Sequence, residues 1–228
     1  MYITKSNIIA KVRMLLNEIG LNDSEFEGGS DEQDLNTMIG DLAVDALRFV
    51  HGNAVAELLE ADGYVFPDQL VATKGVIADA GWAYVDNVSD YFRFVRAHCS
   101  DWKKPLLEAL NEGTPAWDKL YNPLLTATVD NPKASIGKSH TATSEPPYVG
   151  TRITLHGIPP TGNINAYILY IKEPKFEVTE NIWVSRLLQD AFYYYLVYLV
   201  LMALGDARAA TALQQALPLM GLKNTGND

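Results

Sequence analysis

The sequence predicts an α+β protein that is mainly α, a helical bundle built from N- and C-terminal helices with an inserted β-rich subdomain. Three observations predict it. Apolar residues recur at helical spacing over the first 59 residues, aromatic-rich runs of strand-like period follow, and residues 191–204 form an uncharged helical stretch. We therefore predict a discontinuous bundle of residues 1–62 and 177–228, and an inserted subdomain of residues 63–176.

The first helices are predicted from apolar periodicity. Residues 8–19 carry apolar side chains at helical spacing, after Thr4 or Ser6 as the N-cap and before Gly20 as the stop. An acidic connector follows over residues 22–34, the pattern of a solvated loop and helix start. A second helix is predicted from an N-cap at Ser30 or Asp31 through Phe49, and after Gly52 a short continuation runs to Asp62 and Gly63.

Beyond residue 63 the apolar period changes to that of strands. Residues 82–85 and 91–98 are rich in aromatic side chains, and two further apolar runs cover residues 151–156 and 165–171. Residues 111–150 contain five prolines with many Thr, Ser and Asn residues. We expect this segment to be a long extended loop that reaches towards a neighbouring chain.

The C-terminal part contains the most apolar helix pattern. Thr179 is the predicted N-cap, and the 14 residues from 191 to 204 include no charge. A helix that is apolar on all sides is buried in a core, between subunits or in lipid. The stretch is too short for a membrane span, and its four tyrosine hydroxyls favour a protein environment. The N-terminal helices are expected to cover one side, and a subunit or bundle interface the other; a last helix is predicted over residues 207–217.

Composition excludes several classes of function. The net charge of -10 and the pI near 4.8 argue against binding the phosphate backbone of nucleic acid, although an acidic wall would let DNA slide past. Cys99 is the single cysteine, which excludes a disulfide framework and a cysteine-rich zinc site. Residues 1–20 contain no signal-peptide pattern, so we expect synthesis in a cytoplasm and no membrane partner.

No catalytic motif is present. Gly137, Lys138 and Ser139 resemble the end of a phosphate loop, but Pro132 stands where that motif needs a glycine. The four histidines form no metal-binding pair, and neither GxSxG nor GxGxxG occurs. We therefore expect no enzyme, no cofactor and no metal, although an active site assembled from distant residues is a third hypothesis.

The order of elements resembles that of bacteriophage head–tail connector proteins, the adaptor rings of short-tailed and crAss-like phages. An N-terminal helix pair with an acidic connector precedes a β-rich insertion that contains residues 88–95 and 101–105. A tyrosine-rich helix then ends at Gly205 and Asp206. The resemblance covers nearly the whole chain and rests on architecture more than on diagnostic motifs.

This resemblance implies a structural protein of the virion neck or tail, made in the host cytoplasm. Twelve copies would form a ring beneath the portal protein, extend the channel through which genome DNA passes, and carry the next tail ring or nozzle proteins. By position, the portal-docking residues are Leu219, Met220, Leu222, Lys223 and Asn224. The residues predicted at a subunit interface are Tyr193, Tyr195, Tyr198, Trp102, Trp117 and Tyr121.

A carbohydrate- or surface-binding module is the alternative. It would use the aromatic strands of residues 82–85 and 91–95, and it predicts a thermal shift that depends on a glycan. A gene position beside portal and capsid genes would favour the connector instead.

Overall fold

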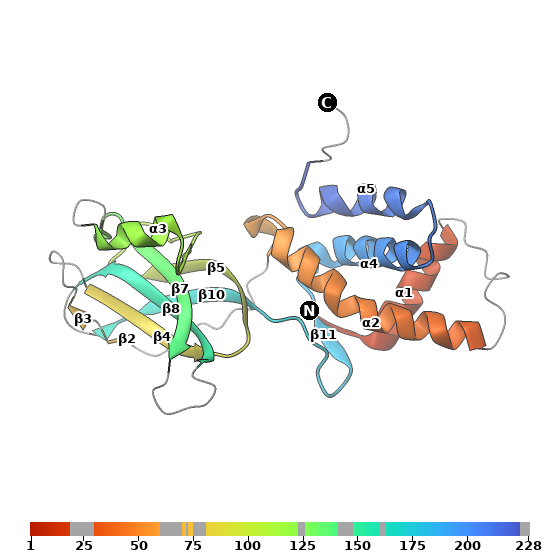
Figure 1. Cartoon of the computed structure of the whole chain (residues 1–228), viewed down its shortest axis with the longest axis horizontal. Helices are drawn as coiled ribbons and strands as arrows, with labels where there is room; N and C mark the ends of the chain where they lie inside the picture. The colour runs from red at the N-terminus through yellow and green to blue at the C-terminus, as the bar shows by residue number, and fades with distance from the viewer. Residues whose placement is uncertain are drawn as a thin grey trace. The chain divides into compact units, whose positions relative to one another are not determined.

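The chain forms two compact units. The computed structural model describes residues 1–18, 30–59, 70–71, 73–74, 81–122, 126–140, 148–159 and 163–223 (Figure 1). One unit, called here the helical unit, comprises Met1–Glu60 with Glu173–Asp228; the other, called the β unit, comprises Ala61–Lys172. The chain thus leaves the helical unit after residue 60 and returns to it at residue 173. The boundaries predicted from the sequence were residues 62 and 176.

The prediction of a mainly helical protein is wrong. In the described residues, a five-stranded sheet and three two-stranded sheets accompany the five α-helices, so a mainly helical bundle is not indicated. Much of the additional strand lies in the segment 111–150, which was expected to be an extended loop. It contains the short helix α3 (Pro115–Asp118) and the strand β7 (Lys133–His140), which pairs with β8 from Lys133 to His140. Strand formation depends on cross-strand partners more than on local preference, so the composition of this segment concealed it.

The helical unit is built from four long helices and one β ribbon. The helices are α1 (Lys5–Glu18), α2 (Ser30–Asn53), α4 (Gln189–Ala203) and α5 (Ala209–Leu219). The ribbon pairs β1 (Tyr2–Thr4) antiparallel with β11 (Asn181–Trp183). Because β11 occupies the start of the segment predicted as helical, the apolar helix begins at Gln189 and not beside Thr179. Short 3-10 turns lie at Ala56–Leu58 and Arg186–Leu188.

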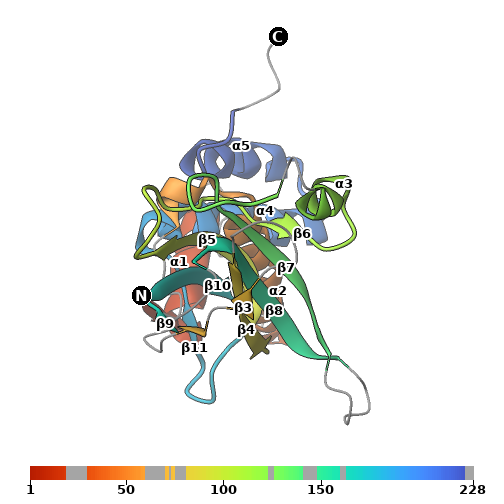
Figure 2. The same cartoon turned by 90° about the vertical axis from the view of Figure 1, so that its left-hand side faces the viewer.

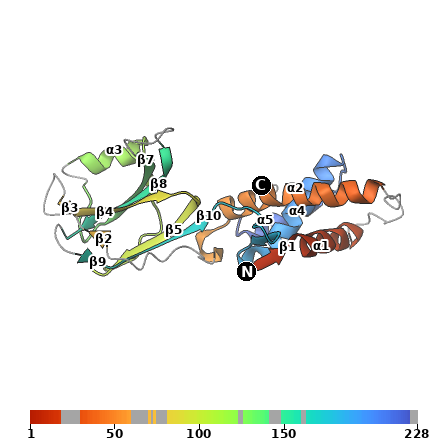
Figure 3. The ribbon, with the colours of Figure 1, turned by 90° about the horizontal axis from the view of Figure 1, so that it is seen from below.

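Helix α4 is the centre of the helical unit. It packs against α1, α2 and α5 (Figures 1 and 3). Eight of its side chains are buried: Ala191, Phe192, Tyr193, Tyr195, Leu196, Val197, Val200 and Leu201. Helices on several sides of α4 account for its lack of a polar face, since each neighbour removes apolar surface from water.

The β unit contains one five-stranded sheet and two strand pairs. The sheet has the order β3-β4-β8-β7-β6, and the pairs are β5–β10 and β2–β9 (Figure 2). The long strands are β4 (Gly81–Val88), β5 (Tyr91–Cys99), β7, β8 (Tyr148–Ile158) and β10 (Ala166–Lys172). The short strands are β2 (Leu70–Val71), β3 (Thr73–Lys74), β6 (Leu110–Asn111) and β9 (Asn163–Ile164), and a 3-10 turn covers Lys119–Tyr121.

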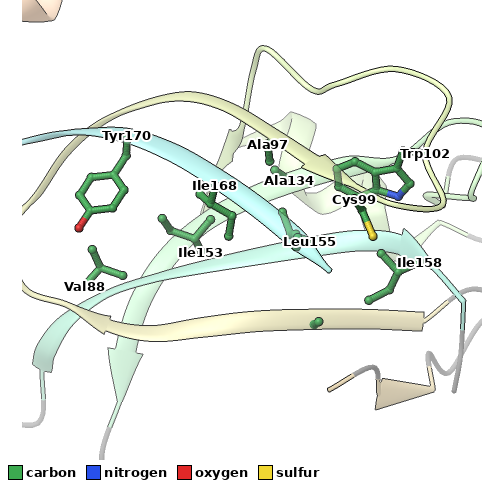
Figure 4. Close-up of a cluster of buried hydrophobic side chains, with 12 residues drawn as sticks. Val88, Ala97, Cys99, Trp102, Ala134, Ile153, Leu155, Ile158, Ile168 and Tyr170 are labelled. Atoms are coloured by element: carbon green, nitrogen blue, oxygen red, sulfur yellow. The ribbon is translucent and has the colours of Figure 1, made fainter. Parts of the chain in front are cut away.

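The core of the β unit lies between the five-stranded sheet and the β5–β10 pair (Figure 4). Ile153 and Leu155 from β8 meet Ile168 and Tyr170 from β10 in this cluster. Trp102 closes one end, where its indole N–H donates to the carbonyl oxygen of Gly157 at 2.9 Å. The two layers bury each other's apolar faces, which explains why the inner positions of β8 are aliphatic.

Gly40→Ala is expected to stabilise the helical unit by about 0.5 kcal/mol, because glycine in a helix costs conformational entropy. Gly40 lies inside α2, and the three atoms nearest to a Cβ there all belong to the end of the Lys5 side chain, with Cε at 2.3 Å. Lys5 is flexible and can move aside. Urea unfolding measures the change, and a loss of stability would mean that Lys5 cannot give way.

Candidate functional site

The tyrosines predicted at a subunit interface lie inside the helical unit. Tyr193 and Tyr195 are buried, and Tyr198 is half-buried. The ring of Tyr195 stacks on Phe49 of α2, with the ring centroids 4.1 Å apart. Burial raises the pKa of the Tyr195 hydroxyl. The contacts that the apolar pattern of α4 requires are thus made by other helices of the same chain.

The tryptophans predicted at the same interface belong to the other unit. Trp102 is buried in the core of the β unit. Trp117 is half-buried on α3, where its backbone N–H donates to the side-chain oxygen of Thr114, the N-cap of that helix. Tyr121 ends a 3-10 turn, and its side chain is outside the described set. The six predicted residues are therefore divided between the two units, with three in each.

The residues predicted to dock on a portal are partly built into the helical unit. Met220 is wholly buried, and its carbonyl oxygen accepts a hydrogen bond from the backbone N–H of Val55 at 3.0 Å. Leu219 is 39% exposed, Leu222 is half-buried and Lys223 is exposed. Asn224 lies outside the described residues. Of this set, Leu219 and Lys223 offer the most surface to a partner.

The outer face of the five-stranded sheet carries an ordered stack of side chains, which we call the aromatic rib: Trp82, Tyr84 and Arg152. The rings of Trp82 and Tyr84 stack with centroids 5.4 Å apart. The guanidinium carbon of Arg152 lies 4.6 Å from the centroid of the Tyr84 ring. Asp86 holds Arg152 from Oδ1 and Oδ2, at 3.0 Å and 2.7 Å. These hydrogen bonds raise the pKa of Arg152, so its charge is permanent.

The aromatic rib is a rigid surface feature suited to recognition. Tyr84 is 41% exposed, and the bidentate bond to Asp86 fixes the orientation of Arg152. Tryptophan, tyrosine and arginine are the residues that most often dominate binding energy in interfaces. The aromatic pattern of residues 82–85 was visible in the sequence. Arg152 and Asp86 are 66 residues apart, and no local signal connects them.

A second polar pair lies on the same face of the sheet. His156 is paired in register with Trp82, and its Nε2 lies 2.8 Å from Oγ of Ser135. Burial lowers the pKa of His156 from 6.5 to about 4, so the imidazole is neutral near pH 7. A serine beside a neutral histidine is also the start of a nucleophilic pair, but a base with so low a pKa is poorly matched to proton transfer near neutral pH. The pair is better explained as a satisfied hydrogen bond.

His156 predicts a loss of stability in acid. The unfolded chain binds a proton at His156 with a pKa near 6.5 and the folded chain with a pKa of about 4. The contribution of His156 to the free energy of unfolding is therefore fully present above pH 6.5. It decreases by about 3 kcal/mol as the pH falls to 4. Urea unfolding at pH 7 and at acid pH measures the slope. His156→Gln should reduce the difference between the two conditions, and an unchanged difference would exclude His156 as its source.

Two further observations concern the described part of the chain. No group of three or more His, Cys, Asp or Glu side chains is placed there to hold a metal ion. None of its helices combines the length and the apolar character needed to cross a membrane. A scan against protein-family models and a search of curated proteins both found no match to this sequence.

Proposed function

We propose that this chain is a structural subunit of a phage head–tail connector. As an adaptor ring beneath the portal protein, it would extend the DNA channel and provide the platform for the next tail components. The proposed ring contains twelve copies, and the proposed location is the neck of the virion. In this function the chain performs no catalysis, and its contacts with portal, tail proteins and other copies are its activity.

The observation that carries the proposal is the discontinuous helical unit. Both ends of the chain contribute to it, and the β unit is inserted between α2 and β11. This order of elements is the basis of the resemblance to connector proteins. An inserted β unit provides a second body for a further partner while the helical unit makes its own contacts.

The charge of the chain also supports the proposal. A net charge of -10 disfavours attraction to DNA phosphates. A channel wall of this sign repels the duplex and lets it pass without being held. Genome passage without sequence-specific binding is the behaviour that a connector requires.

Electron microscopy tests the proposed function directly. The full chain is mixed with the portal protein encoded nearest to its gene, and the expected result is a ring of this chain on one end of the portal. Absence of binding, with portal assembled and both proteins folded, would contradict the proposal. A stable monomer that turns over a substrate with saturable kinetics would also contradict it.

The aromatic rib favours a second candidate function, binding to a glycan or protein on a surface. Its stacked Trp82 and Tyr84 rings and the fixed guanidinium of Arg152 are the residue types that contribute most binding energy in recognition sites. A thermal-shift screen against a broad panel of oligosaccharides tests the carbohydrate form. A shift that Tyr84→Ala abolishes and Tyr167→Ala keeps would support it, since Tyr167 is an exposed tyrosine on the other strand layer. No shift with any glycan would exclude it.

A further inference from the structure

Charge is unevenly divided between the two units and among the helices. The helical unit contains 17 acidic and 8 basic residues, a net charge of -9, whereas the β unit contains 11 acidic and 10 basic residues, a net charge of -1. Within the helical unit, α2 carries five acidic residues and one basic residue. Helix α1 has the opposite sign, with three basic residues and one acidic residue.

The acidic charge of α2 forms a stripe on its exposed side. Asp34, Asp41 and Asp45 are exposed, and their spacing of seven and four residues places them on one face of the helix. Arg48 continues this face, but it is bound to Glu173 at 2.6 Å and to Asp45 at 3.4 Å. The basic residue is therefore occupied within the chain, and the stripe from Asp34 to Asp45 remains negative.

The exposed side chains of α1 that the structure describes include no acidic residue, and the side chain of Glu18 at the end of the helix is outside the described set. This exposed face consists of small or uncharged side chains at helical spacing: Ser6, Asn7, Ala10, Met14 and Asn17. Met14 is 43% exposed, and the half-buried Lys11 and Arg13 lie along the two borders of this face. An uncharged strip with an exposed methionine and basic borders is suited to lie against a negative helix.

We propose that the exposed face of α1 in one copy packs against the acidic stripe of α2 in a second copy. The contact rests on the proposed ring-forming function and identifies the surfaces that would join neighbouring subunits. The lengths agree, since Asn7 to Asn17 and Asp34 to Asp45 each span about 15 Å along a helix. Lys11 then approaches the aspartates of the neighbour.

Charge disfavours a contact of α2 against α2, because the acidic stripes of the two copies would repel each other. A two-fold dimer that paired α1 with α2 twice would satisfy the same charges but would close at two copies. The proposed ring requires the head-to-tail form, which leaves one unused face on each copy and continues to a third copy.

The two faces are separate surfaces of the helical unit. Helices α1 and α2 lie along different edges of this unit when it is viewed from below, and both contact α4 (Figure 3). Within one chain Arg13 reaches Asn36 of α2 at 3.4 Å, and Asn36 is outside the exposed stripe. This hydrogen bond from α1 to α2 therefore does not use the aspartates of the stripe.

Disulfide trapping of the full chain tests the contact. One chain carries Met14→Cys, and a second, isotope-labelled chain carries Thr37→Cys, which lies on the exposed side of α2 between Asp34 and Asp41. Under mild oxidation the mixed dimer should exceed each homodimer by about tenfold. The native Cys99 is buried and does not compete. As a control, Gln214→Cys on the exposed, uncharged side of α5 should give no enrichment with Thr37→Cys.

Charge exchange makes the test specific. Asp41→Lys in the second chain should remove the enrichment, and Lys11→Glu in the first chain should restore it. Statistical proportions of the three dimers, or no dimers at all, would overturn the proposed contact. So would an enrichment that Asp41→Lys leaves unchanged.

The test separates this inference from the proposed function. If this chain forms rings on the portal but the mixed disulfide dimer is not enriched, the α1–α2 contact is overturned and the connector function is kept. Preferential trapping without any portal complex would keep the contact and overturn the connector function.

Discussion

Gly157→Ala is expected to destabilise the β unit by about 3 kcal/mol. Gly157 has a φ of 80°, where a side chain is strained. A Cβ would also lie 2.4 Å from the carbonyl oxygen of Thr128, and backbone cannot move aside cheaply. The Gly157 carbonyl accepts the indole N–H of Trp102, so a shift of this backbone also disturbs the core.

Gly113→Ala is the matched control. Gly113 has a φ of 78°, nearly that of Gly157, but no atom lies within 4 Å of its Cβ position. The control therefore carries only the conformational cost, about 1 kcal/mol. Urea unfolding followed by tryptophan fluorescence measures both variants. Equal losses would mean that the close approach to Thr128 has no energetic effect.

Tyr195→Asp is expected to prevent folding of the helical unit, with a loss of at least about 4 kcal/mol. Tyr195 is buried on α4 and stacked on Phe49, so the aspartate would lose this contact and place a carboxyl group among apolar side chains. Far-ultraviolet circular dichroism and thermal unfolding measure the result. Tyr195→Phe keeps the ring and should retain the fold.

The control for this change is Met202→Asp on the same helix. Met202 is 56% exposed, so its replacement adds a charge without burying it. We expect a loss below about 1 kcal/mol, mainly from the unfavourable position of a negative charge near a helix C-terminus. If Tyr195→Asp were tolerated as well as Met202→Asp, the assignment of the buried face of α4 would be wrong.

Much of the fold could be predicted from local patterns. The periodicity of residues 8–19 and 35–49 corresponds to α1 and α2, and the strand-like runs at 91–98 and 165–171 correspond to β5 and β10. Each has a one-sided or two-sided apolar pattern that repeats within a few residues. The ribbon β1–β11 was missed because its two strands are distant in the sequence. The strand β7 was missed although its partner β8 is the next strand along the chain, because its residues are mostly small or polar.

The candidate surfaces were less accessible to sequence reasoning. The aromatic residues Trp82 and Tyr84 were visible in the sequence as part of a predicted strand. The rib also needs Arg152 from β8 and Asp86, which lies where the register of β4 shifts. The acidic residues of α2 were visible as single charges. Their alignment as a stripe follows from the helix that carries Asp34, Asp41 and Asp45 on its exposed side.

The sequence alone determined that residues 191–204 form a largely buried helix, because the stretch contains no charge and helical periodicity leaves no polar face; Met202 near its end is an exposed exception. Only the tertiary structure decided what buries it. Helices α1 and α2 pack on α4 as the sequence predicted, and α5 of the same chain also packs on it, where a subunit or bundle interface had been expected. Apolar burial has no direction, so a periodic pattern specifies that a surface is covered, while the complementary faces of other helices decide which element covers it.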